Sequence, residues 1–279
     1  MITRLAPAKV NLYLKVLGKR ADGYHHILTL MQRVGLYDEL TFSPGSDGLA
    51  VRCPGSELPE DKGNIVHRAA RSLFEHVSRS PGVEITIGKN IPIAAGLGGG
   101  SSDAATTLLT LNEMFEFGCS GEELMKIGAR IGADVPFFIF GKTAWATGIG
   151  ERLEPAGDIP ALSFLLVNPG FELSTRTVYE GLKMGLTNGV IQYNMPRFQT
   201  LTQVVRGLYN DLERVSIRLH PVISEIKKLL MEHGAIGSLM SGSGPTVFGI
   251  FRNEEDTIAA EREVAKVQVG SVFRAQSIP

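Results

Sequence analysis

The stretch from residue 92 to residue 105 has the residue types of an anion-binding loop. It reads Pro-Ile-Ala-Ala-Gly-Leu-Gly-Gly-Gly-Ser-Ser-Asp-Ala-Ala, and a helix-forming run follows it from Thr106 to Phe115. Its glycines, at 96, 98, 99 and 100, can adopt positive φ and bring backbone N–H groups close to a ligand. Ser101, Ser102 and Asp103 stand where a helix N-cap is expected, so the free N–H groups of the first turn would point into the loop. This arrangement predicts a phosphate site.

The loop differs from two common phosphate-binding motifs. No Gly-Lys-Ser/Thr closes it as in a Walker A loop, and Gly96-x-Gly98-x-x-Ser101 ends on serine where the dinucleotide fingerprint has glycine. A flexible glycine connection is the simple alternative. Other residues must therefore decide which phosphate compound the loop serves.

Lys9 and Asn11 share one face of a predicted strand. Residues 10, 12, 14 and 16 are apolar and alternate with Lys9, Asn11, Tyr13 and Lys15, so the two sets point to opposite sides. A lysine at the start of a strand is usually a solvated surface charge. The pattern by itself therefore favours a surface position over a catalytic one.

Asp134 is an acid in an apolar setting. It lies between a helix predicted over residues 122–131, with a capping box at Ser120 and Glu123, and Pro136, which restricts Val135 to extended geometry. A capping or turn role is favoured, because aspartate often serves there, and a placed catalytic acid is the alternative.

Tyr24 and His25 follow a turn-rich segment, Gly18-Lys-Arg-Ala-Asp-Gly. The tyrosine ring could stack on a nucleobase or simply lie at an amphipathic rim. The histidine, taken alone, is more often an ordinary surface residue.

The elements that must position these groups alternate between strand and helix patterns. Strands are expected over residues 10–16, 36–42, 83–87, 162–167, 246–251 and 271–277, and helices from Asn64 to about residue 78 and over 122–131, 176–184, 221–233 and 253–267. A turn is expected over 43–48 and a polar connection over 185–202. The Gly- and Pro-rich residues 147–160 form the expected domain boundary, which gives domains of 1–152 and 153–279.

Composition limits the class of protein. The chain has 279 residues, 43% of them hydrophobic and 20% charged, with a net charge of −1. These values are ordinary for a globular protein and indicate neither a nucleic-acid nor a membrane partner. The apolar runs are too short to span a bilayer, and no signal peptide is evident, so we expect a cytoplasmic protein. Cys53 and Cys119 indicate no disulfide framework, and the histidines form no zinc pattern, so no structural metal is expected.

Three motifs taken together resemble those of the GHMP small-molecule kinases, and the resemblance covers almost the whole chain. They are Ala6-Pro-Ala-Lys-Val-Asn11, the stretch from Pro92 to Ala105, and Met240-Ser-Gly-Ser-Gly-Pro245. The resemblance implies an α+β, two-domain architecture with the active site in the cleft between the domains. It also implies that Lys9 and Asp134 form the catalytic pair. The ATP phosphates would lie on Pro92, Ile93, Ala94, Ala95, Gly96, Leu97, Gly98, Gly99, Gly100, Ser101 and Ser102.

Three features are similar to one branch of this family: Asp22-Gly-Tyr-His25, the Gly-Leu-Gly-Gly-Gly-Ser-Ser form of the middle motif, and Gly132-Ala-Asp-Val-Pro136. This branch phosphorylates the 2-hydroxyl of a cytidine-diphosphate-linked methylerythritol in non-mevalonate isoprenoid biosynthesis. The branch implies that Asn11, Tyr24, His25, Thr175 and Tyr179 hold this small-molecule substrate. Mg²⁺ is expected with ATP, with Ser101 or Ser102 as a possible ligand. Asp103 is expected to cap the helix or to contact the metal through water. Another GHMP kinase of mevalonate or homoserine type, or a non-catalytic nucleotide-binding regulator, are the alternatives.

Overall fold

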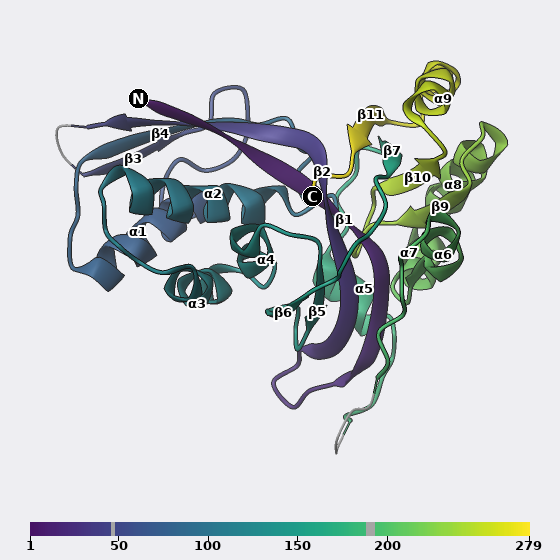
Figure 1. The fold of residues 1–279 in the computed structure, drawn as a ribbon, viewed down its shortest axis with the longest axis horizontal. Helices are drawn as coiled ribbons and strands as arrows, with labels where there is room; N and C mark the ends of the chain where they lie inside the picture. The colour runs from purple at the N-terminus through teal and green to yellow at the C-terminus, as the bar shows by residue number, and fades with distance from the viewer. Residues whose placement is uncertain (46–47, 188–192) are drawn as a thin grey trace. The chain divides into compact units, whose positions relative to one another are not determined.

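The computed structural model describes residues 1–45, 48–187 and 193–279, which form two compact units. The first unit contains residues 1–8, 37–91 and 98–141, and the second contains residues 9–36, 92–97 and 142–279. Two long strands, β1 (Ile2–Lys19) and β2 (His25–Pro44), contribute residues to both units (Figure 1). The predicted boundary at residue 152 concerns the two family domains and stays a prediction.

The first unit combines a sheet with four helices. Its sheet has the order β3-β4-β2-β1, with β3 (Leu49–Arg52) parallel and β2 antiparallel to β4 (Val83–Gly88). The helices are α1 (Ile65–Val77), α2 (Gly99–Met114), α3 (Gly121–Ile131) and α4 (Val135–Phe140), which pack on one another and gather on one side of β3 and β4 (Figure 1).

Local sequence signals explain where two of these helices begin. The side chain of Asn64 accepts a hydrogen bond from the backbone N–H of Val66 and caps α1, as predicted. Ser120 and Glu123 form the predicted capping box at the start of α3. Both helices bury one apolar stripe, which is the arrangement that their periodicity indicates.

The second unit contains a four-stranded antiparallel sheet and the remaining helices. The sheet order is β11-β7-β10-β9, made by β11 (Ser271–Gln276), β7 (Ser163–Asn168), β10 (Val247–Phe251) and β9 (Gly237–Met240). The sheet that contains β3, β4, β2 and β1 has seven strands in all: β1 pairs with β8 (Tyr209–Asn210), and β2 pairs with β5 (Ala144–Thr147), which also pairs with β6 (Arg152–Pro155). The helices are α5 (Thr175–Glu180), α6 (Leu201–Gly207), α7 (Glu213–Leu219), α8 (Val222–Glu232) and α9 (Glu254–Lys266).

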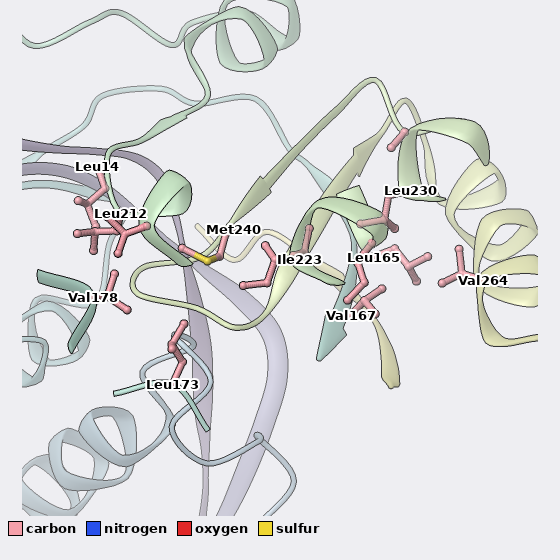
Figure 2. Close-up of a cluster of buried hydrophobic side chains, with 14 of the residues drawn as sticks. Leu14, Leu165, Val167, Leu173, Val178, Leu212, Ile223, Leu230, Met240 and Val264 are labelled. Atoms are coloured by element: carbon pink, nitrogen blue, oxygen red, sulfur yellow. The ribbon is translucent and has the colours of Figure 1, made fainter. Parts of the chain in front are cut away.

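One apolar cluster forms the core of the second unit (Figure 2). Helix α8 buries Ile223, Ile226 and Leu230, which recur at a spacing of three and four residues along one face. Leu165 and Val167, on one face of β7, belong to the same cluster. Figure 2 shows Ile223 in the middle of this group and Leu230 beside Leu165. The core thus fixes α8 on the four-stranded sheet.

The C-terminal tail continues along β2 within the second unit. Ser277 forms a bridge with Val34, and Ile278 donates its N–H to the carbonyl of Arg33 at 2.9 Å. Gln32 Nε2 donates to the carbonyl oxygen of Ile278 at 2.8 Å. The last residues of the chain are therefore part of the edge structure of β2.

Several predicted elements need correction. Helix α2 starts at Gly99 rather than after Ser101–Asp103, and Val135 is helical although it precedes a proline. The helix predicted over 176–184 ends at Glu180, and the strands predicted over 10–16 and 36–42 are parts of the longer β1 and β2. The elements that were not predicted are β3, α4, β5, β6, α6, β8, α7 and β9. Strand β2 runs into the predicted turn as far as Pro44.

Parts of two predicted segments lie outside the described residues: 46–47 of the turn and 188–192 of the polar connection. Among the described helices, none has both the length and the apolar character that crossing a membrane requires.

Candidate active site

Lys9 and the first half of the glycine loop come together in the second unit. The backbone N–H of Lys9 donates to the carbonyl of Leu97 at 2.9 Å, and its ammonium group contacts the carbonyl oxygen of Gly96 at 3.1 Å. Lys9 Nζ also donates to Asn11 Oδ1 at 2.6 Å. The lysine is only 4% exposed, so the surface position favoured by the strand pattern is wrong.

The carboxamide of Asn11 joins Lys9 to a second hydroxyl. Asn11 Nδ2 donates to Thr29 Oγ1 at 2.8 Å, and Thr29 Oγ1 donates to the carbonyl of Tyr13 at 2.7 Å. Asn11 and Thr29 are 3% and 1% exposed. Lys9 therefore belongs to a buried hydrogen-bonded chain.

The turn between β9 and β10 packs on the same loop. Ser241 Oγ donates to the carbonyl oxygen of Gly96 at 2.8 Å, and Asn210 Nδ2 donates to the carbonyls of Met240 and Gly242 at 2.8 Å each. A Cβ on Gly96 would lie 2.2 Å from the carbonyl oxygen of Ser241, and Gly96 has φ of 77°. Only glycine satisfies both the contact and the backbone angle.

The second half of the loop lies in the first unit and starts helix α2. Gly98 is the N-cap with φ of 71°, and the N–H of Ser102 makes the first helical bond, to the carbonyl of Gly98, at 2.9 Å. The backbone N–H groups of residues 99–101 therefore face outward from the helix N-terminus, where an anion is favoured. The expectation of positive φ is confirmed for Gly96 and Gly98, whereas Gly99 and Gly100 are helical. Ala94 adopts φ of 51° instead.

The two serines of this helical turn differ in access. Ser102 Oγ is buried and has no hydrogen-bond partner among the described residues. Ser101 is partly exposed, and its Oγ lies 3.6 Å from the position that a Cβ on Gly132 would take. The Ser101 hydroxyl is thus the better placed of the two for a hydrated magnesium ion, which binds oxygen ligands and keeps several waters.

Asp103 turns inward and does not cap the helix, so the capping expectation is wrong. Its Oδ2 lies 3.3 Å from Lys89 Nζ, and Lys89 also pairs with Asp38. Asp38 Oδ1 accepts the backbone N–H groups of Asn90 and Ile91 at 2.6 and 2.8 Å. This Asp38–Lys89–Asp103 cluster holds the chain just before the loop to helix α2 just after it.

Burial raises the pKa of the Asp103 carboxyl to about 7. The charge of Lys89 opposes this rise in pKa, and the neighbouring charge of Asp38 adds to it. Two carboxylates share one ammonium group at this site, so one of the acids takes up a proton near neutral pH.

Asp134 lies at the N-terminus of α4 in the first unit. It has φ of −86° and ψ of −10° and stands in a turn at the N-cap position, as favoured, but its side chain makes no capping hydrogen bond. Helices α2 and α4 pack together, and Ser101 is next to Gly132. The loop that carries Asp134 is therefore close to the start of α2.

The residues predicted to hold the substrate lie in the second unit. The rings of His25 and Tyr179 are 5.0 Å apart at 32°, and Thr175 Oγ1 lies 2.9 Å from Ser243 Oγ in the turn after β9. Tyr24 is 60% exposed. Burial, and to a lesser degree the charge of Lys19, lower the pKa of His25, so its imidazole is neutral at pH 7.

Five residues that organise the site were given no role from the sequence: Thr29, Asp38, Lys89, Asn210 and Ser241. Of these, Ser241 lies in the third family motif. Asp38 had a signal, because it shares a strand face with Leu36 and Leu40, where an apolar residue is expected. Thr29 and Asn210 had none. Groups of acids, histidines and cysteines suited to a metal ion were not found among the described residues.

Comparison with known proteins identifies the family of this chain. Residues 64–142 match the model of the GHMP kinases N terminal domain, and residues 195–269 match that of the GHMP kinases C terminal domain. The chain belongs to the GHMP kinase family, and its α+β class is that of the family.

Some members of this family are especially similar to this chain in sequence and structure. The 4-diphosphocytidyl-2-C-methyl-D-erythritol kinase of Syntrophus aciditrophicus is 55% identical over 278 residues, which cover 100% of both chains. A crystal structure of 4-(cytidine 5'-diphospho)-2C-methyl-D-erythritol kinase matches with a TM-score of 0.84 at 35% identity and covers all of both chains. A crystal structure of L. major mevalonate kinase has a TM-score of 0.74 at 14% identity, covers 100% of this chain and 96% of its own, and shows the shared fold alone.

Proposed function

We propose that this protein catalyses ATP-dependent phosphorylation of the 2-hydroxyl of 4-diphosphocytidyl-2-C-methyl-D-erythritol, a step of non-mevalonate isoprenoid biosynthesis. The full-length identity of 55% to a kinase of that name carries the proposal. The buried lysine beside the glycine loop supports it, because a non-catalytic nucleotide-binding regulator would need the loop but no such lysine.

In the proposed mechanism the protein positions the two substrates and supplies charge that stabilises the transferred phosphoryl group. Phosphoryl transfer has a loose transition state, so the protein mainly orients the reactants and stabilises charge on the phosphoryl oxygens. Residues 92–102 form the loop around the triphosphate, and the backbone N–H groups of residues 99–101, at the positive end of α2, donate to it. Lys9 contributes its ammonium charge to the transferred group, and Asp134 accepts the proton of the attacking hydroxyl.

The Ser101 hydroxyl is the side chain that would help to hold Mg²⁺ with ATP. Bound magnesium neutralises charge on the phosphate oxygens. Ser102 and Asp103 are proposed to act elsewhere, because their side-chain oxygens are buried within the first unit.

Substrate selection is proposed to depend on the aromatic residues and His25. A base stacked on an aromatic ring gains about 1–3 kcal/mol, and Tyr24 and Tyr179 offer two such rings. Stacking does not distinguish cytosine from uracil, so hydrogen bonds from His25 and from nearby backbone groups are proposed to do so. Asn11 and Thr175 are the other proposed substrate residues. A cytoplasmic location and the lack of nucleic-acid or membrane partners stay predictions.

A substrate panel tests the activity. The purified protein is given ATP and Mg²⁺ with 4-diphosphocytidyl-2-C-methyl-D-erythritol, mevalonate or homoserine in separate reactions, and phosphorylated product is measured. Turnover of the first substrate is expected. Turnover restricted to mevalonate or homoserine would assign another GHMP kinase activity, and ATP binding without turnover of any substrate would favour the regulator.

Two variants test the catalytic pair in the same assay. Asp134→Asn and Lys9→Ala are expected to bind ATP and to lose at least about a hundredfold in kcat, since each removes a group that acts on the reacting atoms. Asp158→Asn, an exposed acid on the surface, is the matched control and should retain kcat. Full turnover by Asp134→Asn would exclude it as the base.

A further inference from the structure

We infer that Thr29 is a positioning residue that holds the catalytic lysine through Asn11. This inference rests on the proposed function, since it assumes that Lys9 acts on the phosphoryl group. It concerns a residue outside the predicted ATP-binding loop and without a signal in the sequence, and it follows from the direction of the hydrogen bonds in the second unit.

The single hydroxyl proton of Thr29 sets that direction. Thr29 Oγ1 lies 2.7 Å from the carbonyl oxygen of Tyr13, and a carbonyl can only accept. The hydroxyl proton is therefore used on Tyr13, and the Thr29 oxygen can only accept from its other neighbour. That neighbour is Asn11, whose Nδ2 lies 2.8 Å away and donates.

The orientation of the Asn11 carboxamide follows at once. With Nδ2 fixed on Thr29, Oδ1 faces the Lys9 ammonium at 2.6 Å, which is the only productive arrangement because lysine has donors and no acceptor. The opposite orientation of the carboxamide would place an N–H₂ group against a cation and an oxygen against the Thr29 oxygen. One hydroxyl thus decides which end of the amide the lysine meets.

Burial of the three side chains prevents water from replacing the hydrogen bonds that orient the Asn11 carboxamide. Lys9, Asn11 and Thr29 are 4%, 3% and 1% exposed, so water is largely excluded as a substitute partner. An unsatisfied polar group at such a depth is expensive, and hydrogen bonds to charged groups are stronger than neutral ones. Loss of the Thr29 hydroxyl would therefore release the carboxamide and loosen one of the contacts that position Lys9 Nζ.

Loss of the Thr29 hydroxyl should affect the contacts to ATP less than it affects the position of Lys9 Nζ. The Gly96 carbonyl would still hold the lysine at 3.1 Å, and Ser241 would still donate to that carbonyl at 2.8 Å. The backbone of residues 92–97 does not contact Thr29 through any hydrogen bond described above. Thr29 should therefore matter for kcat more than for the KM of ATP.

The test compares Thr29→Val with Thr29→Ser in the kinase assay. Valine keeps the shape and removes the hydroxyl, whereas serine keeps the hydroxyl. We expect kcat to fall about ten- to a hundredfold in Thr29→Val, which is the range for loss of the bond between the Lys9 ammonium and the released Asn11 carboxamide, a hydrogen bond to a charged group. The KM of ATP should stay within about twofold, and Thr29→Ser should retain most of kcat. If the valine variant does not fold, Thr29→Ala serves in its place.

A double-mutant cycle separates positioning from a general structural role. Asn11→Ala removes the side chain that connects Thr29 to Lys9, so the double variant Asn11→Ala/Thr29→Val should have nearly the same kcat as Asn11→Ala alone. If the two residues acted independently, their separate effects on kcat would multiply. Wild-type kcat in Thr29→Val, failure of serine to rescue, or full multiplication in the cycle would each overturn the inference. Absence of turnover by the wild-type protein would instead contradict the proposed function.

Discussion

Replacement of Asp103 by asparagine should change how the stability of this protein depends on pH. The carboxyl is buried beside Lys89 and Asp38, and its pKa is raised from 3.8 to about 7. A raised pKa means that folding favours the protonated form. The stabilising contribution is complete below about pH 4 and is lost as the pH rises through about 7.

The size of the effect follows from the two pKa values. Between pH 5 and pH 8, a carboxyl with a pKa of 3.8 in the unfolded chain and about 7 in the folded protein lowers the free energy of unfolding by about 2–3 kcal/mol. Asparagine has the same shape and does not ionise. The free energy of unfolding of Asp103→Asn should therefore fall less between these pH values than that of the wild type, by about 2–3 kcal/mol.

Urea denaturation at pH 5 and pH 8 measures this difference. The m-value must stay constant for the comparison to be valid. Asp158→Asn, which removes an exposed carboxylate, is the control and should follow the wild-type dependence. Parallel pH dependences for wild type and Asp103→Asn would refute the reasoning, because the buried carboxyl would then titrate equally in both states.

Three further predictions concern the loop, the substrate site and the core. Gly96→Ala places a Cβ 2.2 Å from a carbonyl oxygen at positive φ, so it should lower the melting temperature, whereas Gly100→Ala, with its nearest atom at 3.5 Å, should not. Tyr24→Ala should raise the KM of the cytidine substrate about five- to 150-fold and leave that of ATP unchanged; equal weakening of both would contradict stacking. Leu230→Ala should cost about 2–5 kcal/mol in chemical denaturation, against about 0.5 kcal/mol for the exposed Leu219→Ala, and equal values would contradict the assigned core.

Sequence patterns correctly predicted the local features, such as helix caps, that depend on residues close together in the chain. Asn64 and Ser120 cap their helices as expected, because a side-chain oxygen reaches an N–H two or three residues away. The glycine loop and its helix were also predicted. The exact start of that helix was not, because Gly98 already supplies the backbone turn that Ser101 was expected to make.

Long-range contacts account for what the patterns missed. Lys9 looked like a surface residue, yet it is buried against Gly96, which lies 87 residues further along the chain. Asp103 looked like a helix cap, but an ion pair with Lys89 draws it into the interior. Only the resemblance to the kinase family indicated a role for Lys9, and neither the pattern nor the resemblance pointed to Thr29.

The docking of the C-terminal tail on β2 has a practical consequence for protein production. Ser277 and Ile278 bond to the same strand that, a few residues earlier, carries Thr29. A purification tag joined at Met1, which is 87% exposed, leaves the residues that bond to β2 untouched, so this end is preferred for a tag.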